Sequence, residues 1–158
     1  MSTTQKHKVY MANEVAKYLI FLASQKVIGD NQEREGVSNL KLQKLLYFAQ
    51  AYYLSILGRP LFGDKLEAWA YGPVVPGVYQ KYKKYKNTPI ISETDKSNLD
   101  GDDKEVLRKV WDIFGGYSAG RLVDIAHAHT PWKEAYTSND KVITNKTLAE
   151  YYTPLLKK

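Results

Sequence analysis

The segment from Ser38 to Gly58 constrains the fold of this chain most, because its apolar residues recur at the spacing of one face of a helix. The residues on that face are Leu42, Leu45, Leu46, Ala49, Tyr53, Ile56 and Leu57. Ser38 or Asn39 is suited to cap the start of the helix, and Gly58 favours the left-handed conformation that often ends one. The segment therefore predicts a long helix with a wide apolar stripe.

Helical spacing recurs along most of the remaining chain. A first helix is expected over residues 13–27, with Asn13 as its cap and with Met11, Val15, Tyr18, Leu19 and Leu22 on one side, and the polar stretch 29–36 closes it. Others are expected from Pro76 to about Lys86, over a segment carrying Val106 to Phe114 that Gly115 and Gly116 end, from a cap at Ser118, from Thr130 and Pro131, and from Thr144 through Leu155. Six or seven helices predict a compact, mainly α-helical bundle.

Residues 59–76 have a different character, because glycines and prolines interrupt every helical period there. These residues are Pro60, Gly63, Gly72, Pro73 and Pro76. Short apolar pieces, 61–62 and 66–71, lie between them. We expect an ordered but irregular segment that crosses the body of the protein after the second helix.

Length and composition favour a single domain over residues 1–158, because neither an internal repeat nor a linker divides the chain. The sequence contains no cysteine. That excludes disulfides, thiolate metal sites and a thiol nucleophile and is typical of a reducing compartment, so we expect a cytoplasmic protein. The apolar run 18–23 is too short for a signal peptide, and no stretch reaches the ~18 apolar residues of a membrane span.

The histidines give little indication of a catalytic or metal site. They are His7, His127 and His129, and residues two apart on a helix point about 200° apart, so the last two cannot share a metal ion. Asp124 precedes His127 by one helical turn and could hydrogen-bond to it, but such a pair equally stabilises an ordinary helix. Ser118, the nearest hydroxyl, is better explained as a helix cap. A hydrolase would need a nucleophile from elsewhere in the fold.

Acidic and glycine-rich segments indicate no cofactor site either. The acids between residues 93 and 103 lack the ligand spacing and the terminal glutamate of an EF-hand, and those from Asp100 to Asp103 rather favour a helix N-terminus. The pairs Gly72-Pro73 and Gly115-Gly116 match neither a P-loop nor a dinucleotide fingerprint. We expect no metal, no cofactor and no enzymatic activity.

The run Lys81-Tyr82-Lys83-Lys84-Tyr85-Lys86 is the best indication of nucleic-acid binding, because lysines interleaved with rings are typical of strand-binding surfaces. On a helix, however, the tyrosines fall toward Val78 and the lysines toward the other side, which is also the pattern of an ordinary amphipathic helix. The net charge of +6 suits nucleic acid or an acidic protein surface. A protein partner is favoured, and a nucleic-acid-binding regulator that uses the Lys81 to Lys86 face is the alternative.

The longest motif of the chain is Ser-Asn-Leu-Lys-Leu-Gln-Lys-Leu-Leu-Tyr-Phe-Ala-Gln at residues 38–50. Gly58, Pro60-Leu61-Phe62, Glu67-Ala68-Trp69 and Tyr-Gly-Pro-Val-Val-Pro-Gly-Val-Tyr at residues 71–79 follow it. Trp111, Tyr117-Ser118-Ala119, Leu122, His127 and Pro131-Trp132 come later. In these motifs the chain closely resembles the Panacea domain, also called SocA-like, over a core of about residues 11–152.

This resemblance implies an antitoxin that neutralises a toxin protein by direct contact and that is usually encoded beside the toxin gene in a bacterial or prophage genome. The partner is then the product of the adjacent gene. One member of the family also acts as an adaptor that delivers its toxin to a protease. The lack of a long apolar stretch predicts no membrane insertion, and the oligomeric state stays open.

We expect the toxin to contact the aromatic, proline-interrupted part of the chain. The predicted residues are Trp69, Tyr71, Gly72, Pro73 and Tyr79, with support from Lys44 and Tyr47. Large rigid rings provide contact area at a low cost in side-chain entropy, and breaks in regular structure expose backbone groups. The same pattern allows Trp69 and Tyr79 to be core residues. For each of the two taken individually, the core interpretation is slightly favoured.

Overall fold

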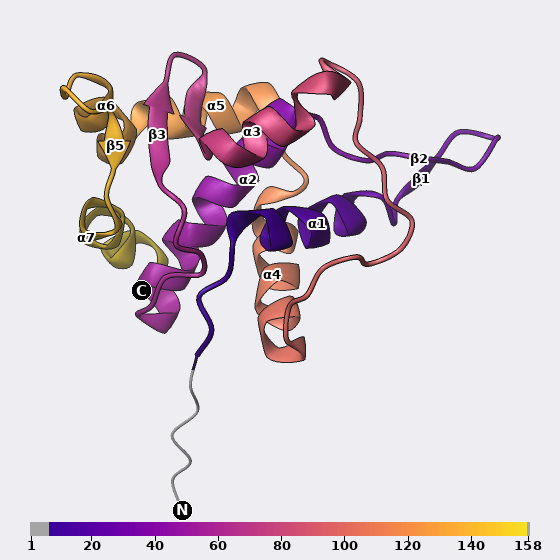
Figure 1. Ribbon diagram of the computed structural model, residues 1–158, viewed down its shortest axis with the longest axis horizontal. Helices are drawn as coiled ribbons and strands as arrows, with labels where there is room; N and C mark the ends of the chain where they lie inside the picture. The colour runs from indigo at the N-terminus through magenta and orange to yellow at the C-terminus, as the bar shows by residue number, and fades with distance from the viewer. Residues whose placement is uncertain (1–6, 158) are drawn as a thin grey trace, which may run out of the picture.

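Helix α2, Asn39–Tyr52, runs through the middle of the protein (Figure 1), whose computed structural model describes residues 7–157. The chain continues as a π-helical segment, Tyr53–Leu57, before Gly58 ends it with a φ of 71°. Ser38 caps the start, because its hydroxyl oxygen accepts a hydrogen bond from the backbone N–H of Lys41 at 3.2 Å. The prediction for this helix is therefore confirmed at both ends.

Six further α-helices lie within residues 7–157. They are α1 Ala12–Ala23, α3 Pro76–Tyr82, α4 Gly101–Phe114, α5 Ala119–Ala128, α6 Thr130–Tyr136 and α7 Asn145–Leu156. Pro76 and Pro131 lie in first turns, and the hydroxyls of Ser118 and Thr144 cap α5 and α7 by accepting backbone hydrogen bonds. The prediction of a compact, mainly α-helical fold is confirmed.

Neighbouring elements cover α2 on all sides, since α1, α4, α5, α7 and strand β4 (Gly72–Val74) all pack against it. Every residue from Leu42 to Ala51 is buried, which is more than the predicted stripe. The additional buried positions include Gln43, Lys44 and Gln50, which have to find polar partners inside the protein. Leu57, predicted on the apolar stripe, is exposed, because the π-helical turn changes the rotation per residue.

Residues 59–76 are ordered, as expected, but the prediction of an irregular segment was wrong. Strand β3, Leu66–Trp69, pairs antiparallel with β4, and Trp69 lies opposite Gly72. Strand β5, Val142–Ile143, pairs with the other side of β3, so the strand order is β4-β3-β5. Pro73 is compatible with this sheet because β4 is an edge strand, and Gly72 adopts a φ of 101° after the turn.

Helix α1 begins and ends earlier than predicted. Met11, expected on the apolar side, is the N-cap residue and is 70% exposed, whereas Asn13, the predicted cap, lies inside the first turn. The backbone N–H of Ala12 donates instead to the carboxylate of Asp64 at 2.8 Å, a distant partner that local sequence does not indicate. After Ala23 the chain forms a hairpin of β1, Val27–Ile28, and β2, Glu33–Arg34, which projects away from the helices (Figure 1).

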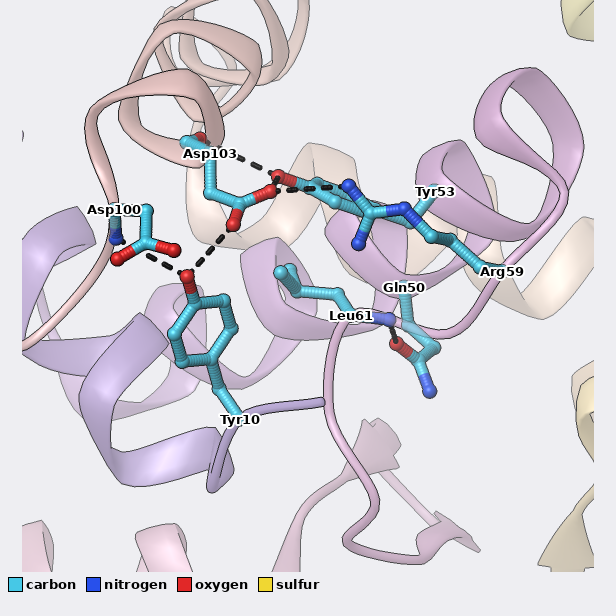
Figure 2. A network of polar contacts seen from close by, with 7 residues as sticks. All are labelled: Tyr10, Gln50, Tyr53, Arg59, Leu61, Asp100 and Asp103. Carbon is cyan, nitrogen blue, oxygen red and sulfur yellow. Dashed lines mark hydrogen bonds and ion pairs between the residues drawn. The ribbon is translucent and has the colours of Figure 1, made fainter. Parts of the chain in front are cut away.

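A buried carboxylate joins three segments that are distant in sequence (Figure 2). Asp103, in the first turn of α4, accepts hydrogen bonds from the hydroxyls of Tyr10 at 2.7 Å and Tyr53 at 2.8 Å, and Arg59 contacts it at 3.3 Å. Burial alone would raise the pKa of Asp103, but these hydrogen bonds and the guanidinium charge outweigh burial and lower it. The N-terminal segment, the end of the π-helical segment and α4 are thereby linked.

Candidate protein-binding cavity

A cavity of about 340 Å³ opens between the N-terminal half of α2, the β3–β4 hairpin and α3 with the 3₁₀ turn Lys83–Tyr85 that follows it. Its lining consists of Asn39, Leu40, Gln43, Lys44, Trp69, Tyr71, Val74, Tyr79, Lys83, Lys86 and Asn87. Aromatic and apolar side chains form much of this lining, with lysines among them. This composition suits the binding of an apolar group that carries negative charge.

The fold brings most of the predicted toxin-contacting residues to this one place. Lys44, Trp69, Tyr71 and Tyr79 line the cavity, although they come from α2, the hairpin and α3. Gly72 and Pro73, both buried in β4, contact the side chain of Lys44. Trp69 and Tyr79 are each half-buried, so they belong to the wall of the cavity.

Tyr47 lies elsewhere. It is fully buried, and its hydroxyl hydrogen-bonds to the hydroxyl of Tyr152 at 2.8 Å, which in turn contacts Nδ1 of His129 at 2.8 Å. Burial raises the pKa of the Tyr47 hydroxyl and lowers the pKa of the His129 imidazole. The structure therefore places Tyr47 in a packed contact of α2 with α7, where it can support the cavity only through the position of α2.

Lys44 is the least ordinary residue of the lining. Its side chain is 0% exposed, and its ammonium group donates one hydrogen bond, to the carbonyl oxygen of Pro73 at 2.9 Å. Within residues 7–157 no carboxylate forms an ion pair with it. Burial lowers the pKa of Lys44 to about 7. At neutral pH Lys44 is therefore only partly protonated, and its protonated form has no counter-charge within residues 7–157.

Gly72 lets the Lys44 side chain pass beneath the hairpin. A Cβ atom at position 72 would lie 2.6 Å from Cε of Lys44, and the φ of 101° is one that other residues rarely adopt. Lys44 and Gly72 are close in space although α2 and β4 are separate elements. The pattern Tyr-Gly-Pro at 71–73 identified the glycine, but it did not indicate what the glycine accommodates.

The aromatic walls are held in place by specific contacts. The Trp69 ring packs edge-on against Tyr79, with centroids 5.1 Å apart, and its Nε1–H donates to the Glu67 carboxylate at 2.9 Å. Tyr71 lies at the turn of the hairpin and is 75% exposed. A large ring with this exposure next to a cavity is typical of a contact residue for another macromolecule.

A polar layer that sequence reasoning missed supports the cavity from α2. Asn39 donates to the backbone carbonyl of Tyr79 at 3.2 Å, and Gln43 donates to Asn39 at 2.9 Å. The side-chain oxygen of Gln43 accepts from the backbone N–H of Val75 at 2.9 Å. These bonds fix α3 and the end of the hairpin relative to α2. The motif at residues 38–50 contains both side chains, but their partners become visible only in the fold.

The lysine-rich run separates buried rings from exposed lysines, as the spacing predicted, but the helix expected to reach about Lys86 ends at Tyr82 and continues as the 3₁₀ turn Lys83–Tyr85. Tyr82 is buried and Tyr85 is half-buried, whereas the lysines at 81, 83, 84 and 86 are exposed. Tyr82 is therefore closed to stacked bases, and Tyr85 exposes only part of its ring. Lys83 and Lys86 lie at the cavity and add positive charge to its rim.

His127 and Asp124, the pair considered for catalysis, are not joined in the structure. His127 packs against Trp132, with ring centroids 4.1 Å apart and the ring planes tilted by 36°, and its Nε2 has no hydrogen-bond partner within residues 7–157. Asp124 is exposed and forms no hydrogen bond with His127 in that part of the chain, so the possible pair is not formed. The described residues contain no cluster of three metal-ligating side chains, and none of their helices is long and apolar enough to cross a bilayer.

The fold is that of a mainly helical protein with a cavity beside one buried helix and a β-hairpin. The chain belongs to the antitoxin SocA-like, Panacea domain family, whose model matches residues 42–133. It is 38% identical over 109 residues to antitoxin SocA of Caulobacter vibrioides (strain NA1000 / CB15N). That alignment covers 61% of this chain and 58% of the relative. No solved structure matches the chain significantly.

Proposed function

We propose that this protein is an antitoxin that neutralises a toxin protein by binding it directly through the cavity face, which we define as Trp69, Tyr71, Tyr79, Lys83 and Lys86. The observation that carries the proposal is the meeting of aromatic residues from two elements at one cavity, with Tyr71 exposed beside it. The family match supports the antitoxin role. We further propose that the partner is encoded by the adjacent gene and that both proteins act in the cytoplasm.

The physical basis of binding is contact with a rigid surface. Trp69 and Tyr79 are already packed on each other, so they lose little side-chain freedom when a partner covers them. Tyr71 offers a large amphipathic ring that has much exposed area left to bury. Inhibition then follows from occupation of the toxin surface and requires no chemistry from the antitoxin.

Co-expression in bacteria tests this function. The neighbouring gene should arrest growth when it is expressed alone, growth should return when this chain is expressed with it, and the two proteins should purify together. Separate elution, with the neighbour still toxic in the presence of this chain, would overturn the proposal. The half-life of the toxin in the rescued cells shows whether the antitoxin also delivers it to a protease.

The exposed tyrosine provides a sharper test. Tyr71→Ala should weaken toxin binding by ~10-fold or more, because exposed aromatic residues at interfaces are frequent hot spots. Tyr117→Ala is the matched control, because Tyr117 is also exposed but lies outside the cavity lining. Both variants should keep the thermal stability of the wild type, and affinity is measured by calorimetry. Equal affinities for the two variants would place the toxin on another face.

A further inference from the structure

The ammonium group of Lys44, beside the cavity, has fewer partners than it can bind. An ammonium group has three hydrogens to donate, and within residues 7–157 Lys44 uses one of them, toward Pro73. A buried cation without a counter-ion destabilises a protein unless another group compensates it. Gln50, which is buried on the same helix, shows the contrast, because both its oxygen and its nitrogen bond to the backbone of the segment 61–62.

The position of Lys44 relative to the cavity suggests what compensates it. Lys44 belongs to the lining, but its side chain is 0% exposed toward the cavity as well as toward bulk solvent, so a ligand group that enters between the rings reaches it only when these side chains shift. Lys83 and Lys86 add positive charge at the same cavity. Among the residues that the structure describes, no carboxylate side chain is part of the lining. An anion on a short carbon chain is the group that fits these surroundings.

We propose that the cavity is a carboxylate-binding site, in which Lys44 supplies the positive charge and Trp69, Tyr71 and Tyr79 surround the carbon chain of the ligand. The bound group is an acidic residue of the polypeptide partner. This assignment of the occupant rests on the proposed function, whereas the carboxylate site itself does not. A cavity of about 340 Å³ is at the lower end of the range for small-molecule sites, so it suits one or two side chains of a docked protein.

Two small molecules of nearly equal shape test the site without the toxin. Phenylacetate carries a carboxylate on an aromatic body, and phenylacetamide replaces it with a neutral amide. Each is titrated into the ¹⁵N-labelled full-length protein at pH 6.5 and constant ionic strength, and the indole N–H signal of Trp69 is followed. We expect phenylacetate to bind at least ~10-fold more tightly than phenylacetamide, because an ionic hydrogen bond is much stronger than a neutral one. Equal affinities, or no binding of phenylacetate up to tens of millimolar, would overturn the proposal.

Substitution of the lysine then identifies the source of the charge. Lys44→Met keeps an unbranched side chain that is one atom shorter and removes the charge, so it should abolish the preference for phenylacetate. Lys41→Met is the matched control, because Lys41 also lies on α2 and donates to a backbone carbonyl, that of Gly115 at 2.7 Å, but is not part of the cavity lining. A preference that persists in Lys44→Met excludes Lys44. Because the comparison of the two ligands uses the wild-type protein, it decides the question even if Lys44→Met does not fold.

The occupant is tested by competition. If the toxin inserts an acidic residue, saturating phenylacetate should weaken toxin binding by at least ~10-fold, and phenylacetamide should not. Lys44→Met should weaken toxin binding while its thermal stability equals or exceeds that of the wild type, which a merely structural lysine would not show. Toxin binding that phenylacetate leaves unchanged would refute the occupant but not the antitoxin function. Absence of any toxin binding would refute the function but not the carboxylate site.

Discussion

Three polar residues of α2 illustrate how differently a buried side chain can be accommodated. Gln50 and Gln43 are both buried, and the amide group of each forms hydrogen bonds through its oxygen and its nitrogen. They stabilise the fold by fixing the segments that cover the helix. Lys44 has one partner and no counter-ion within residues 7–157, so its burial costs stability. Residues that oppose stability are frequently retained for function.

The pH dependence of stability should report on Lys44. Its pKa is about 7 in the folded protein and 10.5 in the unfolded chain, so between these values the unfolded chain binds the additional proton. The free energy of unfolding should therefore rise with pH from about 7 to about 10, by at most ~1.4 kcal/mol per pH unit. Above about pH 10 it should fall, because burial raises the pKa of Tyr47 and Tyr152 and keeps them protonated only in the fold.

Urea unfolding at pH 7, 8 and 9 measures this rise for the wild type and for Lys44→Met. The variant should retain only a smaller rise, for which the lowered pKa of the partly buried Lys41 is one source. Identical slopes in the two proteins would show that Lys44 is not the titrating group.

The Asp103 carboxylate should be a major source of stability. Asp103→Asn places an amide nitrogen where one oxygen accepts the hydroxyl of Tyr10 or Tyr53 and removes the charge that attracts Arg59. We expect a loss of ~3 kcal/mol in the free energy of unfolding. Asp102→Asn is the control, because Asp102 is exposed in the same first turn and its loss should cost less than ~1 kcal/mol. Urea unfolding at pH 7 measures both, and equal losses would contradict the role given to the network.

Lowering the pH should also remove the stabilisation by Asp103 from the wild-type protein. The pKa of Asp103 is lowered in the fold, so its contribution is complete above the ordinary aspartate pKa of ~3.9 and is lost as the pH falls through the folded-state value. Asp103→Asn should therefore lose less stability than the wild type when the pH is lowered from 5 to 3.

At the scale of elements, the sequence predicted what depends on local periodicity. The repeat of apolar residues between Ser38 and Gly58 locates α2, and hydroxyl residues mark the starts of α5 and α7. The three-stranded sheet was missed because β3 and β5 lie far apart in the chain and pair at only two positions, and the alternating burial of β3 extends over only four residues. Gly72 and Pro73 break a helix, and only the pairing of β4 with β3 shows that they also suit an edge strand.

The β3–β4 hairpin should depend on the glycine at position 72. Gly72→Ala introduces a Cβ that meets Cε of Lys44 at a φ of 101°, so we expect a loss of ~2 kcal/mol in stability and weaker binding of phenylacetate. Gly77→Ala is the control, because no atom lies within 4 Å of a Cβ at this position in α3, and it should be neutral or stabilising by up to ~1 kcal/mol. Thermal and urea unfolding measure both. A Gly72→Ala protein as stable as the wild type would show that the hairpin can move away from α2.

For the whole molecule, the candidate site is a product of tertiary arrangement. Tyr71 and Trp69 were singled out as ring-rich positions, but the sequence did not separate Lys44 from Tyr47, which stand one helical turn apart on α2. The fold turns Lys44 toward the hairpin and Tyr47 toward α7. Asn39 and Gln43 were not predicted at the site, because polar side chains near a helix end are ordinary until a cavity forms beside them, and Lys83 and Lys86 were considered only for nucleic acid.

The distribution of charge over the molecule leads to a kinetic prediction. The net charge is +6, and Lys83 and Lys86 concentrate part of it at the cavity. An acidic toxin surface should therefore associate several-fold more slowly at physiological than at low ionic strength, with a smaller change in the dissociation rate. The double variant Lys83→Gln/Lys86→Gln should reduce this salt dependence. Lys109→Gln/Lys146→Gln has the same net charge but alters exposed lysines of α4 and α7, so it should retain more of it. Stopped-flow association with the toxin measures the rates, and an association rate indifferent to salt would show that the positive charge of the cavity does not steer the partner.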